Sequence, residues 1–265
     1  MINFFRKSRK KLADDNKPLK YFRYAIGEIA LVVIGILIAI SINNWNEERK
    51  ERIIEHNYLL RLLKDLEDDK KTLIFSKGLS ESRLAQINLL SNAIENPNTL
   101  SENGYQIIQS IEKITWRSYL YLSRIVYNEL LNSGNMSLIK SEKLREYLAN
   151  YYSDADHWEM ILNIDDSQKE FSQATAGLLS KKILTTNENS ESTTIGKSIQ
   201  NIDLEIEDME IMKIVQELSS NHEAIKWLPQ LYHHHILANK IIIHLLERNE
   251  VLKNLIHLEL KNSST

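Results

Sequence analysis

Four side chains that could bind a metal ion lie within six residues: Asp154, Asp156, His157 and Glu159. Asp154 and His157 are one helical turn apart, so on a helix both project from one face and could coordinate the same ion. A helical di-iron centre needs the Glu-x-x-His motif twice together with two further glutamates, and this sequence has no second copy of a matching motif. We therefore take Asp154 and His157 as the candidate metal ligands, beside the simpler interpretation of a solvated helix face.

Two other motifs have the residue types of a binding site without its spacing. Adjacent residues on a helix point about 100° apart, and none of the eight histidines, including those at 233–235, has another histidine at i+3 or i+4. Gly196-Lys197-Ser198 is similar to the end of a phosphate-binding loop, but Glu191 stands where the first glycine is required. The chain has no cysteine, which excludes disulfides and thiolate sites. We expect no cofactor and no catalytic activity, although catalytic groups distant in sequence leave no local motif.

The composition predicts a protein built from long helices. The 265 residues include only 7 glycines and 3 prolines, too few turn formers for a sandwich, barrel or propeller. Hydrophobic residues make up 43% of the chain and charged residues 26%, which is ordinary for a folded protein. The net charge of −3 gives no indication of a nucleic-acid partner.

The most apolar segment runs from Ala25 to Ile42, and its only ionisable residue is Glu28. Eighteen helical residues rise about 27 Å, close to the roughly 30 Å hydrocarbon core of a bilayer. The charge-free run from Ile29 is shorter, so a cleaved signal peptide and a buried core helix are alternatives. Because 24 residues precede the segment and helix-forming sequence follows it, an uncleaved membrane anchor is the preferred interpretation.

The flanking residues predict the orientation of this anchor. Residues 1–24 contain eight lysines or arginines against two aspartates, whereas the twenty residues after Trp45 contain five lysines or arginines. The positive-inside rule therefore places the N-terminus in the cytoplasm. Tyr24 and Trp45 fit the inner and outer interfaces. Glu28 lies one turn from the cytoplasmic end, where its carboxyl group could reach the headgroups or contact a second membrane helix.

Beyond the anchor, the sequence predicts a bundle of helices. Leu59, Leu66, Leu73 and Ile87 recur at heptad spacing, so we expect the membrane helix to continue into a long helix that packs against its neighbours. Further helices are expected at 105–115, at 119–132, from Ser141 towards 184, and as two helices within 199–260. The polar stretch 185–197 is expected to be a mobile loop. The predicted organisation is a basic cytoplasmic segment (1–24), a transmembrane helix (25–45) and an extracytoplasmic helical domain (46–262).

Two blocks of this sequence resemble a known family. The first is Tyr24-Ala25-Ile26-Gly27-Glu28-Ile29 with Ile42-Asn43-Asn44-Trp45-Asn46-Glu47, and the second is Tyr127-Asn128-Glu129-Leu130 with Ser133-Gly134 and Tyr151-Tyr152. They are similar to an uncharacterised family of single-pass membrane-anchored proteins from Bacteroidota, catalogued as a domain of unknown function. The resemblance implies a membrane-anchored helical protein and brings no activity or catalytic residue with it.

The function we expect is that of a tether, scaffold or accessory subunit in the inner (cytoplasmic) membrane, with most of the chain in the periplasm. Its expected partners are the lipid bilayer and either another membrane protein or a second copy of the chain. The first alternative is a ligand-sensing domain that acts through a membrane partner, with Glu28 as the natural contact. A metal-dependent enzyme is the second.

Overall fold

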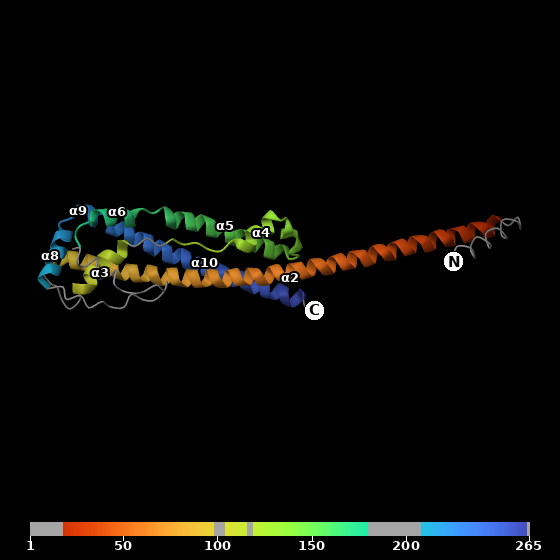
Figure 1. Cartoon of the computed structure of the whole chain (residues 1–265), viewed down its shortest axis with the longest axis horizontal. Helices are drawn as coiled ribbons and strands as arrows, with labels where there is room; N and C mark the ends of the chain where they lie inside the picture. The colour runs from red at the N-terminus through yellow and green to blue at the C-terminus, as the bar shows by residue number, and fades with distance from the viewer. Residues whose placement is uncertain (1–17, 98–103, 116–118, 180–207, 264–265) are drawn as a thin grey trace. The chain divides into compact units, whose positions relative to one another are not determined.

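The computed structural model describes residues 18–97, 104–115, 119–179 and 208–263, and every regular element in these ranges is helical (Figure 1). The predicted all-α class is therefore confirmed for the described residues. The predicted loop 185–197 and most of the segment 1–24 lie outside them. The elements are α2 (Pro18–Glu95), α3 (Gly104–Thr115), α4 (Ile125–Asn132), the 3-10 helix η1 (Asn135–Leu138), α5 (Glu142–Ile164), α6 (Ser167–Ala174), α8 (Asp208–Ser219), α9 (His222–Ile225) and α10 (Leu228–Ser263).

The chain divides into two units, Met1–Tyr58 and Leu59–Thr265, and α2 contributes to both. In the first unit, α2 contains the predicted membrane segment. In the second unit it is one of the core helices. The expected continuity between the membrane segment and the long helix that follows is confirmed, because the structure assigns one helix of 78 residues.

Buried positions on α2 in the second unit follow a regular 3–4 spacing. This spacing keeps one narrow face of a helix turned toward its partners, as in a coiled coil. Ser76, which is half-buried, completes the series. We call this series the α2 seam; its fully buried members are Leu59, Leu62, Leu66, Asp69, Leu73, Ser80, Arg83, Ile87 and Leu90.

Helix α10 has the same spacing and runs antiparallel to α2. Asn249 reaches the backbone of Leu66, whereas His235 contacts Ser80, so the pairing proceeds in opposite directions along the two helices. Helix α5 in turn packs against α10. The buried positions of α10 that follow this spacing are Leu228, Leu231, His235, Ala238, Ile242, Leu245, Asn249, Leu252 and Ile256; Ile241 and Lys253 are buried beside them.

A hydrophobic cluster joins the end of α2 to the shorter helices. Ile87 and Leu90 from α2 pack in one buried cluster with residues of α3, α6, α8, α9 and α10. Phe171 of α6 is completely buried there. Burying a side chain of this size stabilises the fold by roughly 1.5–3 kcal/mol, so this cluster fixes the short helices against the two long ones.

The segment 119–124 differs from the prediction, which made it the first part of a helix reaching Asn132. The structure begins α4 at Ile125. The backbone of the preceding residues bonds to side chains instead of forming helical hydrogen bonds. The amide of Asn163 accepts from the Leu120 N–H at 3.2 Å and donates to its carbonyl at 3.2 Å, and Glu159 accepts from the Leu122 N–H at 2.7 Å. Side chains on α5 therefore replace the helix that local sequence favours.

The helix expected from Ser141 towards 184 begins as predicted but ends early. The Ser141 hydroxyl accepts from the Leu144 N–H at 3.3 Å, which is an N-cap. Helix α5 then stops at Ile164 because Asp165 adopts an extended conformation, and its carboxylate accepts from the Ser167 N–H at 2.8 Å. A second helix, α6, follows.

Helix α4 ends at Asn132, as predicted, and a glycine and a proline lie at helix boundaries. Gly134 follows α4 with φ of 73°, a left-handed conformation that glycine adopts without steric cost. Pro229 lies in the first turn of α10, where its missing N–H costs nothing. The described part of the last segment contains three helices instead of two, because the short α9 stands between α8 and α10.

The pairing between Asn163 and Leu120 predicts the effect of a substitution. We expect Asn163→Ala to lower the free energy of unfolding by about 1–3 kcal/mol, because both backbone groups of Leu120 lose their partner beside the core. The matched change on an exposed position of the same helix, Asn150→Ala, should cost less than about 0.5 kcal/mol. Urea unfolding of the full chain in detergent, followed by circular dichroism, measures both. Equal losses would contradict the assigned role of Asn163.

Candidate functional site

The apolar segment of α2 is exposed on all sides of the helix. Large apolar side chains between Ile26 and Ile42 retain between 47% (Val33) and 65% (Leu31) of their accessible surface. This stretch is long and apolar enough to cross a membrane, and none of it is buried in the structure. A core helix of a soluble protein would be mostly buried, so the described residues do not support that alternative.

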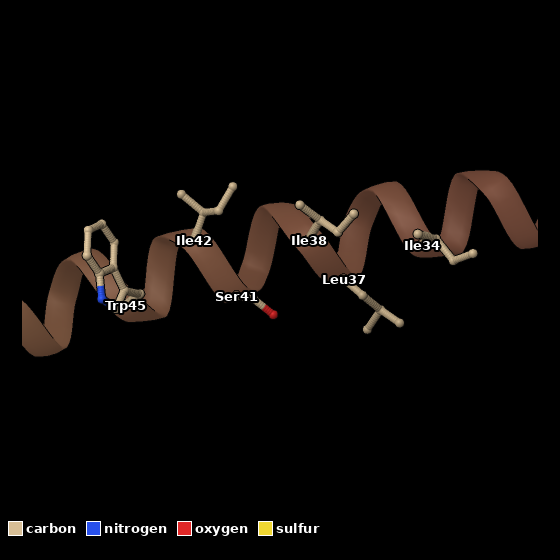
Figure 2. A pocket seen from close by; sticks show the side chains of 6 residues that line it. All are labelled: Ile34, Leu37, Ile38, Ser41, Ile42 and Trp45. Atoms are coloured by element: carbon tan, nitrogen blue, oxygen red, sulfur yellow. The ribbon is translucent and has the colours of Figure 1, made fainter.

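Figure 2 shows one face of this segment, where six side chains border a shallow hollow of about 360 Å³. All six project from the same helix, and apart from the Ser41 hydroxyl and the indole N–H of Trp45 they are apolar: Ile34, Leu37, Ile38, Ser41, Ile42 and Trp45. A hollow lined by a single helix holds no ligand by itself. Lipid chains fill such a surface in a membrane.

The three residues predicted at the membrane boundaries all lie on α2. Trp45 is 64% exposed at one end of the hollow. Glu28 is half-buried near the start of the apolar segment. Tyr24 lies on the helix, but its side chain is outside the described part of the structure.

The candidate metal ligands of α5 have different neighbours. Asp154 Oδ2 lies 3.0 Å from Nε of Arg248 and 3.8 Å from Nε2 of His244, both on α10. The His157 ring is exposed and packs edge-on against Trp158, with 4.9 Å between ring centres. Within the described ranges, no group of three or more His, Asp or Glu side chains has the geometry of a metal site.

The other two carboxylates of that stretch neutralise an arginine. Arg124 Nε lies 2.6 Å from Asp156 Oδ1, and its Nη2 lies 2.9 Å from Glu159 Oε2. Burial raises the pKa of Glu159, and the Leu122 N–H and the Arg124 guanidinium oppose that rise. These ion pairs hold the segment 119–124 against α5, which is a structural task.

A buried polar cluster, which sequence reasoning missed, lies where α2, α5 and α10 meet. Asp69 on the α2 seam is 2% exposed and accepts from the Ser123 N–H at 2.6 Å and from the Tyr151 hydroxyl at 3.2 Å. Asn249 donates to that hydroxyl at 3.3 Å and to the Leu66 carbonyl at 3.0 Å. We call these four residues, Asp69, Ser123, Tyr151 and Asn249, the Asp69 cluster.

Burial decides the protonation behaviour of this cluster. It raises the pKa of Asp69 to about 6, although the hydrogen bonds from Ser123 and Tyr151 favour the charged form. Burial also raises the pKa of the Tyr151 hydroxyl, so the phenol stays protonated and donates to the carboxylate. The cluster therefore changes charge at Asp69 alone near pH 6.

A second polar site lies further along the same seam, toward the other end of α5. The Ser80 hydroxyl donates to the carbonyl oxygen of His235 at 3.0 Å, and Gln168 lies within 3.5 Å of its ring. Burial lowers the pKa of His235 to about 3, and the neighbouring charges of His234 and Arg83 act in the same direction. His235 is therefore neutral at pH 7, as expected for a polar position in a core stripe.

A sequence signal for these residues exists in the seam itself. Asp69, Ser80 and Arg83 fall at 3–4 spacing with the leucines of α2, and His235 and Asn249 do so on α10. Polar residues at such positions must find partners inside the bundle. The same spacing that identifies the core therefore identifies the buried polar contacts.

A comparison with known families assigns this chain. The model of a family of unknown function, DUF6090, matches residues 28–207, about two thirds of the sequence. The chain belongs to the DUF6090 family. The matched range of this DUF6090 chain includes most of the apolar segment, the α2 seam and all of α5. No curated protein and no solved structure matches it.

The Asp69 cluster predicts how the stability of this DUF6090 chain depends on pH. The folded-state pKa of Asp69 is raised, so the folded protein holds this proton more tightly than the unfolded chain. The contribution of Asp69 to the free energy of unfolding is fully present below about pH 4. It falls as the pH rises to about 6, by roughly 3 kcal/mol in total. The difference in unfolding free energy between the wild type and Asp69→Asn should therefore decrease over this range and stay constant above it.

The neighbouring residue provides the control with the opposite sign. Asp68 is exposed, and its hydrogen bond with Lys71 lowers its pKa. The difference between the wild type and Asp68→Asn should therefore increase, if it changes at all, as the pH rises from acid to neutral. Urea unfolding at several pH values between 4 and 7 measures both. A flat or rising difference for Asp69→Asn would show that this carboxyl group is not destabilised by burial.

Proposed function

We propose that this chain is a membrane-anchored helical scaffold or accessory subunit, whose helical unit lies on the extracytoplasmic side of the inner membrane. The observation that carries the proposal is that one helix, α2, has two surfaces of different kinds. Between Ile26 and Ile42 it is apolar and exposed on every side, and from Leu59 to Leu90 it buries a single seam. The first surface suits lipid, and the second suits a folded domain.

Lipid chains can cover the exposed apolar side chains of this segment, whereas water solvates them poorly. Exposing the eleven large apolar side chains between Ile26 and Ile42 to water would be costly, and a soluble protein rarely leaves such a surface uncovered. The eight basic residues before it support an N-terminus in the cytoplasm. Trp45 at the far end has the amphipathic ring that favours the outer interface.

The helical unit offers a partner an exposed apolar surface. Tyr121 is 65% exposed, and Met160 and Ile164 on α5 are 54% and 67% exposed. The hydrogen bonds between Leu120 and Asn163 join the two segments that carry these side chains. Exposed apolar side chains on joined segments of a folded domain are typical of a surface that binds another protein.

The scaffold proposal is tested by site-specific photocrosslinking of the full chain in native membranes. With the photoreactive residue at Tyr121 or Ile164, we expect a covalent adduct of defined mass with another membrane protein or with a second copy of this chain. The same residue at Lys71, whose side chain is 74% exposed in a charged surface, should give none. Adducts at Lys71 as abundant as those at Ile164, or none at any of the three positions, would contradict the proposal.

A ligand-sensing role through a membrane partner is the second candidate. The observation that favours it is a small cavity of about 40 Å³ in the helical unit, lined in part by Arg83, Asn163 and His234. In that case the charge state of Glu28 should affect the contact within the membrane. A photoreactive residue placed beside the span should then form an adduct with the membrane partner. Glu28→Gln should remove this adduct while the chain remains in the membrane. Retention of every adduct in the Glu28→Gln variant favours the scaffold.

A further inference from the structure

A groove of about 380 Å³ lies where the C-terminal end of α2 meets α9 and the start of α10. Its floor is apolar and firmly held, because Ile87 and Leu228 belong to the buried hydrophobic cluster at this end of α2, and Ile94 packs against that cluster. Helix α9 contributes Ile225 to the lining. The volume falls within the roughly 300–1,000 Å³ of sites that hold small molecules.

Polar side chains of α2 line the groove with their hydrogen-bonding capacity unused. Asn88, Ser91 and Glu95 follow one another at 3–4 spacing, so they project from one side of the helix over about 10 Å. No hydrogen bond or ion pair joins these three side chains to another described residue. A few unpaired polar groups beside an apolar floor are what a small-molecule site uses to orient its ligand.

The charge at the α2 end of the groove is negative. Glu95 is exposed and is the last residue of α2, whose last turn contains no basic residue. The C-terminal end of a helix carries a partial negative charge, to which this carboxylate adds. None of the described residues that line the groove is a lysine or an arginine. Lys226, next to Ile225 in sequence, is paired with Glu223. This end of the groove therefore favours a cation and disfavours an anion.

The α10 side of the groove provides an aromatic wall. Tyr232 is half-buried and packs against the hydrophobic cluster, and its ring lies edge-on to that of His233, with 6.2 Å between the ring centres. Both residues line the groove. The ring of a tyrosine attracts both apolar groups and organic cations.

We propose that this groove binds a small organic cation, whose apolar body contacts Ile94 and Ile225 and whose amino group lies beside Glu95. Charge complementarity at the end of α2 favours an amine over an acid with the same body. The apolar floor favours an amine with an aromatic or aliphatic body over a small hydrophilic one. The Ser91 hydroxyl and the Asn88 amide oxygen can accept hydrogen bonds from the ammonium group. The proposal concerns binding alone and does not depend on whether the helical unit is a scaffold.

The test compares four probes on the full chain in lipid nanodiscs, with empty nanodiscs subtracted, by saturation-transfer NMR. Phenethylamine has the cation and the apolar body, 2-phenylethanol and 3-phenylpropionate have the body with a neutral or an anionic group, and methylamine has the cation alone. We expect saturable binding of phenethylamine, weaker binding of phenylethanol, and no binding of phenylpropionate or methylamine.

Three variants locate this binding in the groove. Glu95→Gln should weaken phenethylamine binding about two- to fivefold, the effect of losing one exposed ion pair, and leave phenylethanol unchanged. Glu81→Gln removes an exposed glutamate of the same helix that is paired with Lys77 outside the groove, and it should change neither. Ser91→Phe places an aromatic ring in the groove at a half-buried position and should abolish the binding of both probes.

Three results would overturn the proposal. The first is a phenethylamine signal no larger than that of empty nanodiscs. The second is phenylpropionate binding as tight as that of phenethylamine, which would show that the groove does not select a cation. The third is equal phenethylamine binding in the wild type and in Ser91→Phe, which would place the bound amine elsewhere on the chain.

Discussion

The structure depends on a constraint carried by α2, which has to satisfy two environments along one helix. Between Ile26 and Ile42 its large apolar side chains are exposed in every direction. From Leu59 onward the helix buries one narrow, mainly apolar seam, and most of its other side chains are polar or charged. A helix with the first pattern is stable where lipid covers it, and a helix with the second needs partner helices in water. The proposed anchoring role and the packing of the bundle both rest on this change of pattern.

Within the bundle, polar side chains in the seams determine which residues lie opposite each other. Apolar seams at 3–4 spacing tolerate shifts along the helix, because one leucine fits much like another. The hydrogen bonds from Asn249 to Leu66 and from Ser80 to His235 each match one position on α2 with one on α10. Asp69 fixes the position of a third helix, α5, because it accepts a hydrogen bond from Tyr151 of that helix. It also accepts one from the backbone N–H of Ser123. At neutral pH a buried carboxylate contributes little to stability. Its hydrogen bonds instead determine which residues of the three helices lie opposite each other.

The sequence predicts the regular parts of this fold well and the irregular parts poorly, for physical reasons. Local spacing and capping predicted the continuous α2, the helix end at Asn132 and the helix start at Ser141. The segment 119–124 was wrongly predicted as helix, since its backbone bonds to Asn163 and Glu159, which lie far along the chain. The Asp69 cluster and the Arg83 cavity are formed in the same way by distant residues. Asp154 and His157 had the spacing for a metal site, but α10 supplies the basic partners of Asp154, Arg248 and His244.

The central claim is that α2 crosses the membrane with the helical unit outside, and single-cysteine labelling tests it most directly. The natural chain has no cysteine, so Ser8→Cys and Ser153→Cys each introduce one label site, the second on an exposed position of α5. In right-side-out membrane vesicles, a membrane-impermeant maleimide should label the Ser153→Cys chain and spare the Ser8→Cys chain, and inverted vesicles should give the opposite result. Labelling of both variants from the same side, or loss of the Ser8→Cys site from the mature protein, would contradict the account.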